Sequence, residues 1–285
     1  MLSRRGTTLV ELLVALVLSA VLLGAASSSL LRQQRAARWV GASSAAESQV
    51  RHVVRLVAGE LALLDAESGD VAAGQASDSS LELRAVVASA LSCDTAATVV
   101  TLAPAGAVVP PLSGVARAPA SGDSLWYAAD SLGWRARAVV GVARASAACL
   151  LPSAPSGLTY RLTLDAPIDV GGATPLRLTR WERYVVYRAS DGRWYAGIRD
   201  WSVASARFLA PQPVAGPFLR ALPTGERTGF RFFDSLGTPL VPDGTNERAI
   251  ARVRITTLTA VPAWSTSDSV RRDSADVALA RRASP

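Results

Sequence analysis

The sequence predicts an α+β protein: a long amino-terminal helix, membrane-inserted in its first half, packs on a mainly antiparallel β-sheet domain. Three observations predict this class. An apolar run extends from Leu9 to Leu31, and about 20 such residues can cross a bilayer as a helix. None of the 16 prolines precedes Pro104, so no proline interrupts a helix that continues past the run. Beyond residue 80 the apolar residues adopt the alternating period of strands.

The helix is expected over residues 7–64, with residues 9–31 as its transmembrane part. Beyond the membrane, apolar residues recur at spacings of three and four, which places them on one face of a helix; they are Val50, Val53, Val54, Val57, Leu61 and Leu64. This stripe should pack on a sheet. The single histidine, His52, lies beside the stripe and offers no set of metal ligands.

Residues 65–80 are rich in Asp, Ser, Gly and Ala, and are expected to form a loop that ends the helical part. Residues 81–285 are expected to form one β-rich globular domain. Asp191-Gly192 predicts a tight hairpin turn, and the prolines from Pro211 to Pro223 predict a long irregular connection. The expected strands are Leu81–Val87, Thr98–Leu102, Trp134–Val142, Leu158–Leu164, Trp181–Arg188, Trp194–Asp200, Phe230–Phe233 and Ala249–Thr259.

The composition fits a folded, basic protein. The 49% hydrophobic fraction suits a packed core, the net charge is +7, and the chain contains arginine but no lysine. Most arginines are dispersed along expected strands: Arg252 and Arg254 alternate with Val253 and Ile255, as on a half-buried strand. The denser groups leave lipid headgroups, nucleic acid and a neighbouring subunit open as partners; they are Arg32/Arg35/Arg38, Arg271/Arg272 and Arg281/Arg282.

Glu11 places a carboxylate early in the apolar run. Eleven Leu and Val residues lie between Leu9 and Leu23. Each favours insertion by about 0.3 to 0.6 kcal/mol, against roughly 3 kcal/mol for one central acid, so insertion remains favourable. Acids inside membranes usually face protein and serve a function, so Glu11 requires a partner.

Two simpler interpretations leave this acid unexplained. A secretory signal peptide would use Arg4 and Arg5 as its charged start and Gly24-Ala25-Ala26 as a cleavage site. Its apolar region, however, is usually only 7 to 15 residues long. A plain membrane anchor likewise has no use for the carboxylate of Glu11.

The segment Gly6-Thr7-Thr8-Leu9-Val10-Glu11 resembles the type III signal of type IV pilins and type II secretion pseudopilins. The resemblance implies that a prepilin peptidase cuts between Gly6 and Thr7, removes residues 1–6 as a leader and methylates the new amino terminus at Thr7. Glu11 then becomes the fifth mature residue and an assembly contact. Thr7 departs from the family pattern, which usually has phenylalanine at this position.

The same resemblance implies where the protein lies and what it contacts. It implies a single-pass protein of the inner (cytoplasmic) membrane with an exported carboxy-terminal domain, later found in a pilus or pseudopilus. Its expected partners are the prepilin peptidase, other minor and major pilins or pseudopilins, the inner-membrane assembly platform and membrane lipid. Nucleic acid is a less favoured partner, and no cofactor is expected. Charge counting does not fix the orientation, because arginines flank both ends of the apolar run.

The carboxy-terminal part resembles, more loosely, PilW-type minor pilins and the J-type minor pseudopilin. The segments that carry this resemblance are Arg183–Tyr187, Phe230–Asp234, Arg252–Ile255 and Asp276–Leu279. A minor subunit of this kind helps to initiate or cap assembly of a type IV pilus or type II secretion pseudopilus. The alternatives are an adhesive or DNA-binding tip subunit, and a membrane-anchored exported domain unrelated to pili.

Cys93 and Cys149 are the two cysteines of the chain, with neither CxxC spacing nor a metal signature. In an exported domain they are expected to form a disulfide, and two buried free thiols are the alternative.

No enzymatic activity is expected. The sequence contains no HExxH, GxSxG or phosphate-loop signature, and His52 has no cysteine or serine partner. The acidic segment Asp243–Glu247 lacks the spacing of a calcium-binding EF-hand loop and is more simply explained as a turn.

Overall fold

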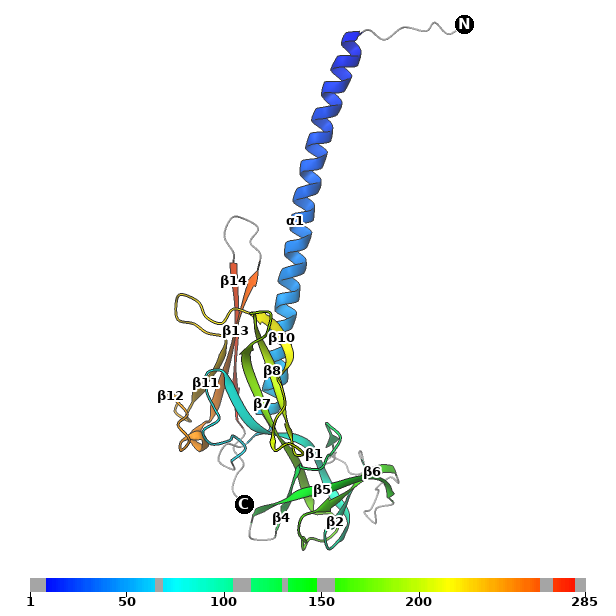
Figure 1. The fold of residues 1–285 in the computed structure, drawn as a ribbon, viewed down its shortest axis with the longest axis vertical. Helices are drawn as coiled ribbons and strands as arrows, with labels where there is room; N and C mark the ends of the chain where they lie inside the picture. Colours follow the sequence, from blue (N-terminus) through cyan, green and yellow to red (C-terminus); the bar gives the residue numbers. More distant parts are fainter. Residues whose placement is uncertain are drawn as a thin grey trace, which may run out of the picture. The chain divides into compact units, whose positions relative to one another are not determined.

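The computed structural model describes residues 9–64, 69–104, 114–129, 133–147, 157–261 and 269–279. The chain divides into two compact units, Met1–Gln49 with Thr259–Arg271, and Val50–Leu258 with Arg272–Pro285. One long helix is followed by strands that pair almost entirely antiparallel (Figure 1). The predicted α+β class, with a long apolar amino-terminal helix and a mainly antiparallel β domain, is confirmed.

Helix α1 (Leu9–Leu61) has 53 residues. Its first part, in the first unit, is built of Leu, Val and Ala, of which leucine and alanine are strong helix formers. Ser28 is accommodated because its Oγ donates a hydrogen bond to the carbonyl oxygen of Ala25 at 2.8 Å, as helical serines often do. No side chain from Leu9 to Leu31 is buried. This stretch therefore gains no stability from packing within the described chain.

The end of α1, in the second unit, packs on the sheets. The predicted stripe is confirmed, since Val50, Val53, Val57 and Leu61 are buried together with Leu64 just after the helix. They share one hydrophobic core with residues of both sheets, including Leu81, Leu83, Phe230, Phe232, Val253 and Ile255. His52 is exposed beside the stripe.

Two long strands, β1 (Ser80–Ala96) and β7 (Pro175–Arg188), form the centre of the main sheet. They pair antiparallel from Ser80 opposite Val185 to Leu91 opposite Pro175. On the other side of β7 follow β8 (Trp194–Ser202) and then β10 (Gln212–Phe218), while the short β9 (Arg207–Phe208) also pairs with β8. The β7–β8 connection is the predicted hairpin, with Gly192 at a positive φ of 78° and the Asp191 carboxylate accepting the Arg193 N–H.

The predicted irregular connection across Pro211–Pro223 is wrong in part, because strand β10 contains Pro213 and Pro217. Proline lacks an N–H and is excluded from central strands, but it is tolerated at a sheet edge. Among the strands that the structure describes, β10 pairs only with β8, so it is such an edge strand. The prolines therefore indicate the position of the strand in the sheet and not the absence of a strand.

The other ends of β1 and β7 belong to a closed ring of strands. Strand β7 pairs with β4 (Ser124–Ala128), which is followed by β5 (Trp134–Ala147), β6 (Gly157–Leu164) and β2 (Val99–Leu102), and β2 pairs with β1. The two-residue β3 (Gly114–Val115) lies against β1 outside this ring. Closure removes exposed edges, and the interior is filled by side chains as in small barrels; fully buried examples are Val87, Val100, Leu102, Leu125, Leu162 and Leu178.

A second sheet has the order β12 (Pro239–Leu240), β11 (Gly229–Phe233), β13 (Arg252–Val261) and β14 (Ser269–Ala278), and the short 3-10 helix η2 (Glu247–Ala249) precedes β13. The predicted alternation on β13 is confirmed. Val253 and Ile255 are buried, whereas Arg254 is only partly buried and binds Asp276 through two hydrogen bonds of 2.6 and 2.7 Å.

Candidate functional site

The predicted processing residues, Gly6 and Thr7, lie outside the described residues. The described chain begins at Leu9, and Glu11 lies in the first turn of α1. A carboxylate is favourably placed there, because the unpaired N–H groups of a helix start carry partial positive charge. The candidate site is therefore an acidic side chain at the start of an apolar helix.

The side chains around Glu11 are apolar on every face of the helix. Leu9 is 81% exposed and Leu12 is 58% exposed, and successive residues of a helix point about 100° apart. A helix that is apolar all round is typical of a membrane span or a fully buried helix. By length and composition α1 can cross a membrane, with a most apolar window of mean hydropathy 2.5 and nothing buried there.

The apolar run is followed directly by arginines. Arg32, Arg35 and Arg38 are exposed on α1, and Trp39 is exposed beside them. Tryptophan and long basic side chains favour the boundary between hydrocarbon and water. These residues thus mark where the apolar part of the helix ends.

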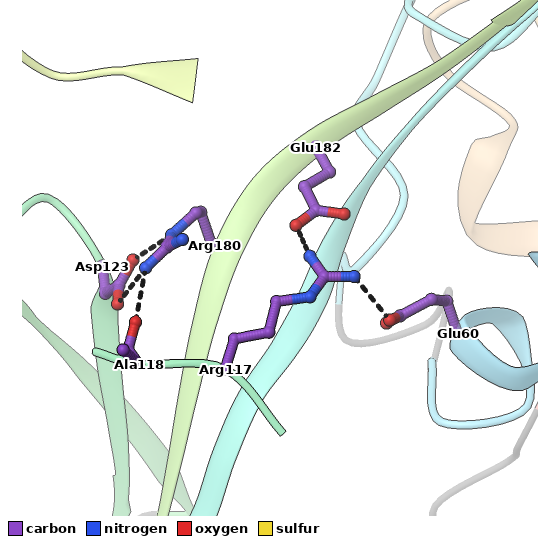
Figure 2. A network of polar contacts seen from close by, with 6 residues as sticks. All are labelled: Glu60, Arg117, Ala118, Asp123, Arg180 and Glu182. Atoms are coloured by element: carbon purple, nitrogen blue, oxygen red, sulfur yellow. Dashed lines mark hydrogen bonds and ion pairs between the residues drawn. The ribbon is translucent and has the colours of Figure 1, made fainter. Parts of the chain in front are cut away.

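In the second unit a charged cluster ties the end of α1 to the main sheet (Figure 2). One terminal nitrogen of Arg117 lies 2.9 Å from Oε1 of Glu60 on α1. The other terminal nitrogen pairs with Glu182 on β7, whose side chain is fully buried. One guanidinium therefore holds two carboxylates from elements far apart in the sequence.

A second ion pair fixes the segment that carries Arg117. Nε of Arg180 lies 2.6 Å from Oδ1 of the buried Asp123, and Nη2 of Arg180 lies 3.0 Å from its Oδ2 and 3.2 Å from the carbonyl oxygen of Ala118 (Figure 2). The hydrogen bond to Asp123 raises the pKa of Arg180. Arg180 and Glu182 are two residues apart on β7, so they lie on the same face of the strand. Strand β7 thus binds Arg117 through Glu182, and it binds the segment next to Arg117 through Arg180.

Burial changes the proton affinity of this cluster. It raises the pKa of the Glu60 carboxyl, against the charge of Arg117, which lowers it. Burial also raises the pKa of the Tyr184 hydroxyl, and the charge of Glu60 adds to that effect. The cluster joins side chains of α1, of β7 and of the segment that carries Arg117, so it acts as a structural tie.

A third contact lies just past the helix. Nη1 of Arg177, on β7, lies 3.1 Å from Oδ2 of Asp70, and Nη2 donates to the carbonyl oxygen of Leu63 at 3.1 Å. Carbonyls at a helix end carry partial negative charge, so a cation is stabilising there. Sequence reasoning did not find Arg117, Glu182 or Arg177, because no local motif marks residues that meet only in the folded sheet.

The structure describes only one of the two cysteines of the predicted disulfide. Cys93 lies in β1 and is not a free thiol, whereas Cys149 lies outside the described residues, so their bridge stays a prediction.

Within the described ranges, no group of three or more His, Cys, Asp or Glu side chains is arranged to hold a metal ion. The predicted turn at Asp243 is confirmed, since its carboxylate accepts the N–H groups of Thr245 at 2.9 Å and Asn246 at 3.2 Å. These backbone bonds lower the pKa of Asp243.

Comparison with known proteins agrees with this geometry. Residues 1–27 match the family described as the prokaryotic N-terminal methylation motif. The match supports a protein of the type IV pilin and pseudopilin kind, a class that is structural and not enzymatic. The motif implies processing by a prepilin peptidase and association with other pilins, and the apolar helix fits a single-pass, membrane-anchored protein. No curated protein and no solved structure matches the chain.

Proposed function

We propose that this protein is a minor pilin or minor pseudopilin, of the PilW or J type, that helps to initiate or cap assembly of a type IV pilus or type II secretion pseudopilus. The observation that carries the proposal is Glu11. Its carboxylate lies in the first turn of a helix whose apolar side chains are exposed on every face, within the matched methylation motif.

In this proposal the prepilin peptidase cuts between Gly6 and Thr7 and methylates Thr7. The amine of Thr7 and the carboxylate of Glu11 are both costly in hydrocarbon, and each offsets the other. Residues four apart meet on one helix face, so a pair within the chain is one arrangement. Pairing of Glu11 with the amine of a neighbour already in the filament would also fix the axial register of the incoming subunit.

The proposed location follows from the same features. Residues 9–31 span the inner membrane, residues 81–285 form the exported domain, and the chain is drawn from the lipid into a pilus or pseudopilus. Its partners are then the prepilin peptidase, other pilins or pseudopilins and the assembly platform.

The structural ties at the end of α1 support a role as a filament subunit. Arg117 joins Glu60 to Glu182, and Arg177 binds the carbonyl of Leu63, so the last turns of the helix are held on the sheet by charged contacts as well as by apolar packing. A subunit whose helix is fixed in a filament presents a defined surface only if its globular part is fixed to that helix.

Intact-mass measurement of the protein from cells that possess the peptidase tests the class. The mature chain should lack residues 1–6 and begin with N-methylated Thr7. A Gly6→Leu variant should retain its leader and serves as the control. Cleavage after Ala26, or an uncut native chain, would contradict the proposal. Identification of the pilin-like chains that co-purify then distinguishes a pilus from a secretion system.

A further inference from the structure

One face of the main sheet carries a basic groove, defined by Glu82, Arg183, Arg199, Trp201, Arg207 and Phe208. The cavity there has a volume of about 680 Å³. Strands β1, β7 and β8 provide its floor, and the β8–β9 hairpin with the residues that follow it provides its wall.

The floor of the basic groove contains a like-charge pair. Arg183 on β7 is directly opposite Arg199 on β8 in the strand register, and Glu82 is opposite Arg183 on the other side. Like charges directly opposite each other destabilise a sheet. Of the described residues that line the cavity, Glu82 is the one carboxylate, against three arginines. The groove therefore holds an excess of positive charge.

The arginines are held in place, and one of the three is neutralised. Arg183 forms an ion pair with Glu82, to which its Nε donates at 3.0 Å and its Nη2 also donates, and its guanidinium lies 4.4 Å from the centre of the Phe208 ring. Arg199 donates to two backbone carbonyls, of Leu209 at 2.7 Å and of Phe208 at 3.2 Å. Carbonyl oxygens orient a guanidinium but carry no net charge. Arg207 is exposed at the rim.

Aromatic side chains lie among these arginines. Trp201 is half-buried, and its ring packs edge-to-face on Phe208 with the ring centres 5.1 Å apart. Such packing fixes the tryptophan at the groove. Single-stranded nucleic acids are bound by positively charged grooves that follow the phosphates and by aromatic rings on which bases stack. An acidic polysaccharide offers the anions but no flat aromatic base.

We propose that the basic groove binds single-stranded nucleic acid, with Arg199 and Arg207 on phosphates and a base stacked on Trp201. The excess of arginine over carboxylate in the groove, with Arg199 held by backbone carbonyls and Arg207 exposed, is the observation that favours an anionic ligand, and the aromatic pair favours one with bases. The proposal does not rest on the assembly role of α1, because all of these residues belong to the second unit.

The test uses the full chain in detergent micelles and a fluorescent deoxythymidylate oligomer of about 15 nucleotides, within the usual range of site sizes. Fluorescence anisotropy gives the affinity at several salt concentrations. The groove variant is Arg199→Gln with Arg207→Gln. The matched control is Arg161→Gln with Arg231→Gln, which removes two exposed arginines on β6 and β11 outside the groove.

The native chain and the control should bind alike, and the groove variant should bind at least about tenfold more weakly. The slope of log affinity against log salt should fall by about 1.4 in the groove variant, because each phosphate contact on a single strand contributes about 0.7. Trp201→Ala should weaken binding at least about fivefold, and Trp201→Phe should retain most of it.

Arg207→Gln alone keeps the proposal testable if the double variant misfolds, since Arg207 is exposed; it should lower the salt slope by about 0.7. Absence of binding by the native chain, or an equal loss in the control variant, would overturn the proposal. Binding of polygalacturonate through the groove without binding of the oligonucleotide would assign the groove to acidic polysaccharide instead.

Discussion

The two ends of helix α1 share one secondary structure but differ in where their apolar surface is buried. From Leu9 to Leu31 no side chain is buried, and Leu9 is 81% exposed. At the other end Leu61 is 0% exposed and belongs to the core that joins the helix to both sheets. The second end thus finds its apolar partner within the chain, whereas the first end does not find one in the described residues.

The two ends of α1 therefore contribute to different properties of the protein. The second end contributes to the stability of the fold, and the first end contributes to association with other molecules. Fully burying one leucine or valine is worth about 1.5 to 3 kcal/mol, so a run of exposed ones in water is strongly unfavourable. The first end must therefore be covered by lipid or by other helices. Substitutions there should change what the protein associates with, and substitutions at the second end should change whether it stays folded.

The largest expected effect concerns the β region alone. A Cys93–Cys149 bridge would close a loop of about 57 residues. By the chain-entropy relation, this closure stabilises the folded state by about 4 kcal/mol. Replacing both cysteines by serine should lower the free energy of unfolding by that amount and leave membrane abundance unchanged. Thiol labelling of the denatured, unreduced protein should find no free cysteine, and labelling of both would refute the bridge.

Leu61→Ala should disrupt the packing of the second end of α1 on the sheets and lower the free energy of unfolding. Removal of a fully buried leucine side chain costs about 2 to 5 kcal/mol, depending on how far the cavity collapses. Denaturant unfolding of the full chain in micelles, followed by tryptophan fluorescence, measures the loss. Leu22→Ala is the matched control, because Leu22 is exposed; its unfolding midpoint should equal that of the native chain. Equal losses in both variants would remove the distinction between the two ends.

Arg117→Ala should weaken the tie between α1 and the sheet by about 2 to 3 kcal/mol. Breaking a buried ion pair costs about 3 to 5 kcal/mol because it leaves an uncompensated charge, and the partial exposure of Arg117 reduces that cost. A triple variant, Arg117→Met with Glu60→Gln and Glu182→Gln, removes the two carboxylates together with the guanidinium. It therefore leaves no uncompensated charge and should recover most of the stability. If the triple variant is no more stable than Arg117→Ala, then buried charge is not the cause of the loss.

The smallest effect is a dependence on pH. Because burial raises the pKa of Glu60 above 4.5, the folded state binds this proton more tightly than the unfolded state. Stability should therefore fall as pH rises from about 4.5 through the raised pKa, by about 1.4 kcal/mol for each pH unit that separates the folded-state pKa from the unfolded-state pKa. Unfolding of Glu60→Gln and the native chain at pH 4 and pH 7 measures this, and the Gln variant should lack this component of the pH dependence. A native chain whose Glu60-dependent stability rises with pH would contradict the sign.

The parts of this fold that could be predicted from the sequence depend on local periodicity. The stripe Val50–Leu64, the hairpin at Gly192 and the alternation on β13 each follow from residues within a few positions of one another. The closed ring could not be predicted, because it requires the ends of β1 and β7 to diverge from one sheet and pair with β2 and β4. The cluster at Arg117 was equally inaccessible, since Glu60 and Arg117 are 57 residues apart. At the amino terminus the motif predicted Glu11 as an assembly contact, a role that still has to be tested.

The central claim is that the first end of α1 serves association between chains, and Glu11→Val tests it most directly. The variant and a Leu12→Val control should match the native chain in membrane abundance, leader cleavage and unfolding midpoint, because Glu11→Val makes the helix more apolar, Leu12→Val keeps an apolar side chain, and the β region is unchanged in both. Co-purification with the other pilin-like subunits should be lost in Glu11→Val and kept in Leu12→Val. If Glu11→Val assembles as well as the native chain, its carboxylate is not an assembly contact.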